Sequence, residues 1–226
     1  ERMSTLTPID SASGSRGRPA GDSWSAAWRD LAADPSVERL RGLPALPQVD
    51  LLHSVQVTRL ALTLFDALGM PLELAAAGRH ELAAAAFWHD SGQSISEQRH
   101  HKHSYALIMA LDIPQWDALI QLRVACIARY HRKQLPRGAH EGFGRLDKAS
   151  RRRVRQLAAL LRIADGLDYT HRSMVRTLKV ALDDQVLYLD VGAPRAADAE
   201  LFGARRKADL FEHTFGRRID LYREDA

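Results

Sequence analysis

Residues 83–92 read Ala-Ala-Ala-Ala-Phe-Trp-His-Asp-Ser-Gly, a helical run of small residues that ends in a histidine and an aspartate. Small side chains let such a helix pack closely against its neighbours, and Gly92 ends the helical pattern. Adjacent helical residues point about 100° apart, so His89 and Asp90 can both reach one ion only beyond the helix end. A lone His-Asp pair is more often a capped helix end, so the pair needs support from elsewhere in the chain.

Two further polar residues lie in apolar helical segments and supply that support. His53 follows two leucines, 36 residues before His89, and Asp165 follows Leu-Leu-Arg-Ile-Ala, 75 residues after Asp90. A charged aspartate among apolar neighbours is costly unless it is paired or bound to a metal. Imidazole and carboxylate donors together suit one or two divalent transition ions of Mn, Fe, Co, Ni or Zn. We therefore predict a metal site built from His53, His89, Asp90 and Asp165.

Several ordered motifs resemble a known family. The order His…His-Asp…Asp resembles the HD superfamily of metal-dependent phosphohydrolases. More narrowly, the motifs resemble the C-terminal HD region of the exopolyphosphatase/guanosine pentaphosphate phosphatase (Ppx/GppA) family, over about residues 50–220. They comprise Trp-His-Asp-Ser-Gly at 88–92, His-His-Lys-His-Ser at 100–104, Ala-Arg-Tyr-His-Arg-Lys at 128–133, residues 160–171 and residues 207–216.

The resemblance implies a phosphohydrolase that acts through a metal-activated water, with His89 and Asp90 at the catalytic centre. The substrate would be a phosphate ester or phosphoanhydride of a nucleotide or a polyphosphate-like anion. A second ion would be held by His131 and one histidine of the 100–103 cluster. His101 aligns better with two-metal relatives, whereas His103 lies nearer the predicted helix. Asp90 would bridge the two ions.

Other residues near these motifs are assigned supporting roles. Arg132, Lys133 and Arg172 are the candidates for binding substrate phosphate. Asp168 and His171 are expected to orient metal ligands from outside the first layer of donors. Gln93 stands where related cyclic-dinucleotide phosphodiesterases carry a lysine. The glycine-rich phosphate loops of the family's actin-like N-terminal half have no counterpart in this sequence.

The charge pattern points to an anionic partner. Net charge is +4, and residues 129–162 hold eleven Lys or Arg against one Glu and one Asp. We expect the arginines at 151, 152 and 155 to line the metal cleft and hold remote phosphates. A solvated basic helix face is the alternative. A nucleic acid is a less favoured partner than a phosphorylated small molecule or polyphosphate.

The periodicity predicts a mainly α fold with a small C-terminal ββαβ subdomain. Residues 1–21 are expected to be a disordered tail, 22–173 a helical HD domain, and 174–226 the α+β subdomain. Helices are predicted at 25–33, 36–41, 50–68, 71–78, 81–90, 103–111, 114–130, 148–168 and 197–214. Strands are predicted at 177–182, 186–191 and 218–222.

Composition narrows the remaining possibilities. The chain has 226 residues, and 46% of them are hydrophobic, as in a globular protein. No apolar run approaches the length needed to span a membrane. The one cysteine, Cys126, excludes an internal disulfide and favours a cytoplasmic location. Besides an enzyme, we consider a non-catalytic polyphosphate- or nucleotide-binding regulatory module and a scaffold that forms a homodimer. A complete donor set favours the enzyme, because a binding domain does not need all four residues.

Overall fold

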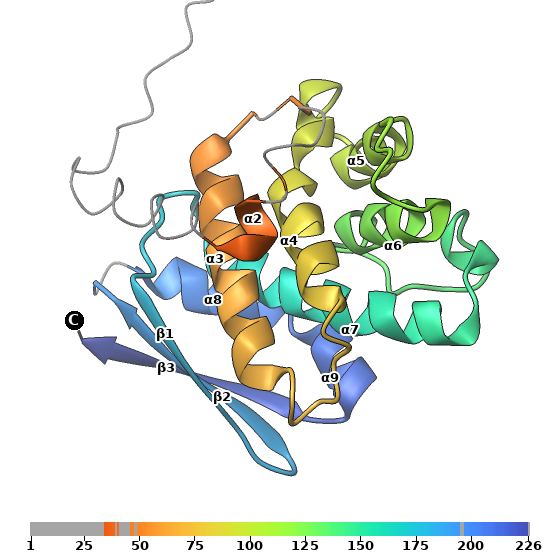
Figure 1. The fold of residues 1–226 in the computed structure, drawn as a ribbon. Helices are drawn as coiled ribbons and strands as arrows, with labels where there is room; N and C mark the ends of the chain where they lie inside the picture. Colours follow the sequence, from red (N-terminus) through yellow and green to blue (C-terminus); the bar gives the residue numbers. More distant parts are fainter. Residues whose placement is uncertain (1–33, 39, 41–45, 48, 195–196, 226) are drawn as a thin grey trace, which may run out of the picture.

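The computed structural model describes residues 34–38, 40, 46–47, 49–194 and 197–225 (Figure 1). The fold is mainly helical with a small C-terminal three-stranded sheet, which confirms the predicted fold class. The helices are α2 (Pro35–Glu38), α3 (Leu51–Leu68), α4 (Gly78–Trp88), α5 (His100–Met109), α6 (Ala118–Arg129), α7 (Lys148–Gly166), α8 (Asp198–Arg206) and α9 (Asp209–Phe215). The predicted tail and the helix predicted at 25–33 lie outside the described residues.

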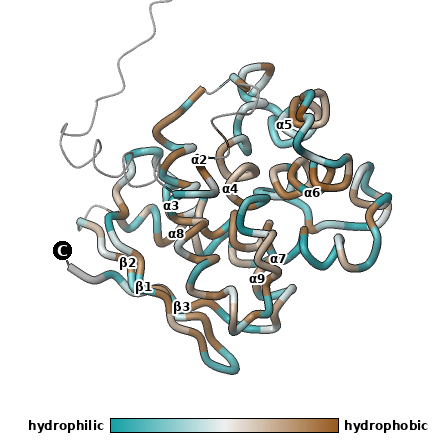
Figure 2. Tube along the Cα trace, viewed as in Figure 1, coloured by the Kyte–Doolittle hydropathy of each residue, from teal (hydrophilic) through white to brown (hydrophobic). Residues whose placement is uncertain are grey.

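Helix α4 forms the middle of the helical core. Its alanines 83–86 are all fully buried, and α4 packs against α3, α6 and α7 (Figure 1). Methyl side chains allow these helix axes to approach closely, so the end of α4 lies deep inside the protein. Hydrophobic segments run along α6 and the strands, whereas the connecting loops are mainly hydrophilic (Figure 2). The core thus encloses the His-Asp pair.

Aspartates begin three of the long helices. Asp50, Asp117 and Asp147 each accept a hydrogen bond from the backbone N–H three residues later, at 3.1, 2.6 and 2.6 Å. This N-cap satisfies a donor that the first helical turn leaves without a partner. The caps fix where the helices start and therefore the direction of the side chains that follow.

The sheet is small and of mixed direction. Strand β1 (Thr177–Leu182) pairs antiparallel with β2 (Val186–Ala193), as the hairpin prediction required. Strand β3 (Arg218–Asp225) pairs parallel with β2. The parallel pairing needs a crossover, and α8 and α9 provide it while packing on α7.

Several predicted boundaries were wrong. No helix forms at 71–77, because Glu73 is left-handed with φ 51°, and α4 begins at Gly78. Helix α5 begins at His100, directly after a left-handed Arg99 with φ 59°. The single helix predicted at 197–214 is two helices, interrupted at residues 207–208. Among the described residues, no helix combines the length and apolar character of a membrane span.

Candidate metal centre

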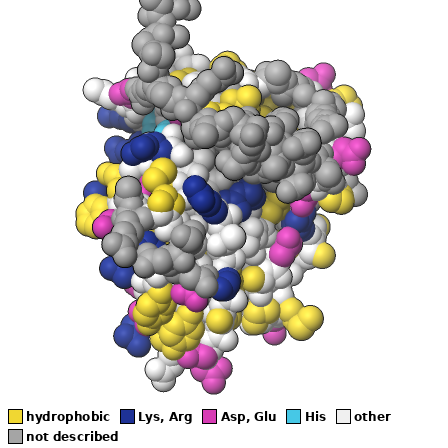
Figure 3. Space-filling view, turned by 90° about the vertical axis from the view of Figure 1, so that its left-hand side faces the viewer, with side chains coloured by type: hydrophobic (Ala, Val, Ile, Leu, Met, Phe, Trp, Pro, Cys, Tyr) yellow, Lys and Arg dark blue, Asp and Glu magenta, His cyan; other side chains and the backbone are white. Residues whose placement is uncertain are grey.

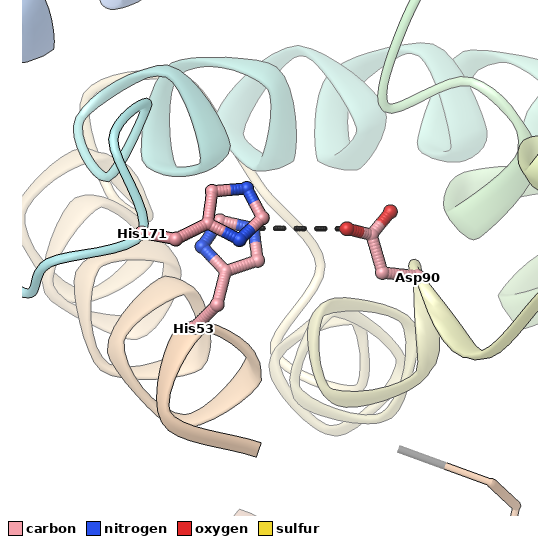
Figure 4. A group of neighbouring side chains, drawn as sticks. All are labelled: His53, Asp90 and His171. Carbon is pink, nitrogen blue, oxygen red and sulfur yellow. Dashed lines mark ion pairs between the residues drawn. The ribbon is translucent and has the colours of Figure 1, made fainter. Parts of the chain in front are cut away.

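Three helices bring their ends together around the His-Asp pair. His53 comes from the first turn of α3, His89 and Asp90 follow α4, and Asp165 lies in the last turn of α7. The histidines at 53, 89 and 131, which lie beside this point, are at most 1% exposed. Figure 4 shows Asp90 facing His53, whose ring is stacked on that of His171 at 3.6 Å between centroids. The predicted first-ion residues therefore lie in one place.

The first donor group contains His53, His89 and Asp165. The Nε2 atoms of His53 and His89 are 3.3 Å apart, and His53 Nε2 lies 3.5 Å from Asp165 Oδ1. One atom from each residue lies within 4.8 Å of the others. Asp90 Oδ2 lies 3.6 Å from His89 Nε2, beside this group. Two imidazoles and a carboxylate at this spacing fit the preferences of a divalent transition ion.

The second donor group contains Asp90, His100 and His131. The Nε2 atoms of His100 and His131 are 3.1 Å apart, and both face Asp90 Oδ1, at 3.1 and 3.5 Å. The atoms of this group also lie within 4.8 Å of one another. The two oxygens of Asp90 therefore face different groups, the geometry expected of a shared carboxylate.

Acceptors on the outer side of the rings fix which nitrogen faces inward. His53 Nδ1 lies 2.8 Å from Asp168 Oδ2. Asp168 was predicted to orient a metal ligand, and this contact places it beside one of the candidates. His89 Nδ1 and His131 Nδ1 lie 2.7 Å from the carbonyl oxygens of Ala86 and Ala128. A ring that donates its Nδ1 proton outward keeps Nε2 available for an ion. Each ring is thus oriented before any ion binds.

Burial and neighbouring charges set the protonation of the centre. Burial lowers the pKa of His89 and that of His131, so both are neutral. Burial also opposes charge on His53, but Asp165 and Asp168 outweigh it and raise the pKa of His53 to about 10. Burial raises the pKa of Asp165, yet Lys207 and His53 hold it well below its usual range. The metal-free centre therefore carries ionised carboxylates, neutral rings at His89 and His131 and a protonated ring at His53, whose inward proton a bound ion would replace.

Gly92 allows the end of α4 to approach α5. A Cβ at this position would lie 2.2 Å from the backbone oxygen of His100 and 2.4 Å from the nitrogen of Ser104. Ser104 Oγ donates to the backbone oxygen of His89 at 2.6 Å and accepts from Gly92 N at 2.9 Å. This contact places His100 opposite Asp90.

Two predicted ligands lie outside both donor groups. The structure brings His100, and not His101 or His103, into the second group. Because α5 begins at His100, the next residue points about 100° away. His101 is still buried, and burial lowers its pKa to about 4. The left-handed Arg99 before α5 was not recognisable from the sequence. The sequence therefore could not show which histidine of the 100–103 cluster faces Asp90.

A cavity of about 570 Å³ adjoins the second group and the edge of the first. Its lining includes two of the predicted phosphate contacts, Arg132 and Lys133, but not Arg172. The α8 end adds Arg206 and Lys207, which the sequence analysis did not assign to the site. Figure 3 shows Lys and Arg side chains spread over one face, with hydrophobic side chains between them and a small histidine surface. The cavity suits an anionic ligand.

The basic face of α7 does not line this cavity, so that expectation was wrong. Arg151 donates to the backbone oxygens of Phe143 and Gly144, and Arg155 lies over the Phe143 ring. Arg152 forms an exposed ion pair with Glu73. These side chains lie in the first half of α7, about 15–21 Å along the helix from Asp165. They hold the surrounding loops to the helix.

A family comparison agrees with this geometry. The family model described as Ppx/GppA phosphatase, domain III, matches residues 37–197, more than half of the chain. The chain belongs to the Ppx/GppA phosphatase family. All residues of the two donor groups fall within the matched segment, whereas α8, α9 and β3 follow it. No curated protein matches the chain.

The hydrogen bond from His53 to Asp168 yields a first prediction for this family member. Asp168→Asn removes the charge that orients His53, so we expect Mn²⁺ affinity to fall about 10–100-fold. Isothermal titration of the metal-free protein measures the change. Asp112→Asn, an exposed substitution, is the matched control and should bind Mn²⁺ normally. Unchanged affinity in Asp168→Asn would show that Asp168 has no part in metal binding.

Proposed function

We propose that this protein is an HD-type, metal-dependent phosphohydrolase that cleaves a phosphate ester or phosphoanhydride. The substrate would be a nucleotide or a polyphosphate-like anion, as the sequence motifs suggest. The observation that carries the proposal is the position of Asp90, with one oxygen facing each of two histidine-containing donor groups. Membership of a phosphatase family and a basic cavity beside the donors support it.

The proposed mechanism assigns a role to each donor. His53, His89 and Asp165 would hold one divalent ion, His100 and His131 a second, and Asp90 would contact both. Such ions supply Lewis acidity, which activates water and offsets negative charge on a phosphate. The outer hydrogen bonds keep Nδ1 protonated on His89 and His131, so these rings hold no proton on the inward nitrogen.

The remaining side chains of the cavity would orient the substrate. Arg132 Nη1 lies 3.2 Å from His100 Nε2, so a phosphate beside the second group falls within reach of this guanidinium. Gln93 Nε2 donates to Asp90 Oδ2 at 2.5 Å and so orients the shared carboxylate. Cys126 is fully buried, and burial raises its pKa to about 12, so it is not the nucleophile.

A metal titration combined with a phosphate-release screen tests the proposal. The protein is stripped with a chelator and supplied with Mn²⁺, Fe²⁺, Co²⁺, Ni²⁺ or Zn²⁺ in turn. An ion at a hundred times its Kd contributes about 2.7 kcal/mol, which for this length should raise Tm by about 5–10 °C. Phosphate release from nucleotides, cyclic dinucleotides or polyphosphate should appear only with the ion.

His213→Ala is the matched control, because this exposed histidine on α9 lies outside both donor groups. It should keep both the shift in Tm and the activity. Failure to bind any of the five ions would reject the proposal. Normal ion binding without hydrolysis of any substrate would favour the non-catalytic binding module instead.

A further inference from the structure

Lys207 reaches the metal centre from the C-terminal part of the chain. It directly follows α8, and its Nζ forms an ion pair with Asp165 Oδ2. The other oxygen of Asp165 lies 3.5 Å from His53 Nε2 in the first donor group. One carboxylate is therefore shared between a lysine ammonium and a candidate metal site.

Close helix packing brings Lys207 to this position. A Cβ at Gly166 would lie 2.6 Å from Ala204 Cα, and a Cβ at Gly203 would lie 2.6 Å from the backbone oxygen of Gly166. A side chain at either glycine would push α8 away from α7. Gly166, which makes this contact, directly follows Asp165. The closeness of α7 and α8 at this point therefore determines how far Lys207 lies from the Asp165 carboxylate.

A buried glutamate fixes the same helix near its start. Glu200 is fully buried in α8, and its Oε1 accepts a hydrogen bond from Thr170 Oγ1 in the segment after α7. The helix is thus attached to α7 at two places, through Glu200 and through the glycine contact. Lys207 follows a helix of fixed position, although its own side chain is 24% exposed and lines the cavity.

The charges of the cavity change when an ion binds. Arg162, one basic side chain of the lining, is paired with Asp209 at 2.5 Å. Lys207 is paired with Asp165, the carboxylate that a divalent ion in the first group would also need. An ion in the first group would repel the Lys207 ammonium and compete with it for the Asp165 carboxylate. Lys207 also lines the cavity, so its ammonium can turn toward a ligand there.

We propose that Lys207 is a substrate-positioning residue, which pairs with Asp165 in the metal-free protein and turns to the substrate phosphate when the ion is bound. This inference rests on the proposed function. It extends that function by adding a residue that lies outside the family-matched segment. Because the ammonium competes with the ion but attracts the phosphate, its removal must shift the two affinities in opposite directions.

Isothermal titration of Lys207→Met tests this directly. We expect the metal-free variant to bind Mn²⁺ about tenfold more tightly than the wild type, because a competing cation is gone. We expect the Mn²⁺-loaded variant to bind inorganic phosphate about 10–100-fold more weakly, the loss typical of one charged hydrogen bond. Lys207→Arg keeps the charge and should retain phosphate affinity.

Lys148→Met, an exposed change at the start of α7, is the control and should alter neither affinity. Lys207→Gln serves as a second variant if the Met variant does not fold by circular dichroism. Unchanged affinities, or a loss of both together, would overturn the inference, since a merely structural lysine acts that way. A wild type that binds no Mn²⁺ would overturn the proposed function, and this inference with it. Normal wild-type binding with an unaltered Lys207→Met would overturn the inference alone.

Discussion

Replacing Asp90 with asparagine is expected to remove both ions and to abolish phosphate release. The substitution keeps the shape of the side chain but removes the charge whose two oxygens face the two donor groups. Changes to outer hydrogen-bond partners already cost about 10–100-fold in metal affinity or activity. We therefore expect a loss of at least about a hundredfold in phosphate release. Elemental analysis should fall from two ions per chain to none.

Two histidine variants make this result specific. His131→Ala removes a donor of the second group alone, so it should retain one ion per chain. His103→Ala lies outside both groups and should retain two. If Asp90→Asn still bound two ions, Asp90 would not be the shared ligand, and the proposed arrangement would be wrong.

Replacing Arg162 with methionine is expected to have the largest effect on stability. Its guanidinium is buried and donates to the backbone oxygens of Tyr130, Lys133 and Gln134, at 2.8, 2.7 and 3.1 Å. Methionine leaves these three acceptors without that donor, at about 1 kcal/mol each. The free energy of unfolding should fall by about 3 kcal/mol, and Tm by about 6–12 °C. Urea unfolding measures the first and calorimetry the second.

Arg152→Met provides the comparison for this change. Arg152 is an arginine of the same helix, but its side chain is 66% exposed in a surface ion pair with Glu73. Such pairs contribute about 0–1 kcal/mol, so this variant should unfold close to the wild type. If both variants lost the same stability, the buried hydrogen bonds of Arg162 would not account for its effect.

The sequence was sufficient to predict the mainly helical fold and the group around His53. An aspartate or histidine among leucines and alanines is costly unless something compensates it, and that cost identifies the residues as a candidate site before the structure is known. The hairpin was predictable for a similar reason, because the periodicity changes from 3.6 to 2 residues near Thr177. The buried polar residues and the change in periodicity can both be recognised within a short stretch of sequence, so neither depends on how the helices pack.

The second donor group depended on information that is not local. His100, His101 and His103 all fit the pattern, and the left-handed Arg99 and the close contact at Gly92 together turn His100 toward Asp90. The run of arginines on α7 was misleading because charge alone does not reveal a partner. Arg155 lies over the Phe143 ring and Arg152 pairs with Glu73, although both arginines were predicted to bind phosphate.

Lys207 was missed because residues 197–214 have the pattern of one amphipathic helix. In the structure the helix is interrupted at this lysine, whose backbone N–H bonds to Gly203 and Ala204. A lysine on a continuous surface helix has no reason to reach a buried carboxylate. The interruption, together with the close approach of Gly166 and Gly203, depends on packing across elements far apart in sequence.

The order of these elements along the chain has a consequence during biosynthesis. Every candidate ligand, from His53 to Asp165, leaves the ribosome before α8, Lys207 and the last strand β3. If the helical part of the chain folds before the last segment emerges, the ligand cluster would form for a time without its lysine. In that interval a divalent ion would meet no competing ammonium at Asp165. If both proposals hold, translation would present the centre for loading before it adds the lysine proposed to bind phosphate.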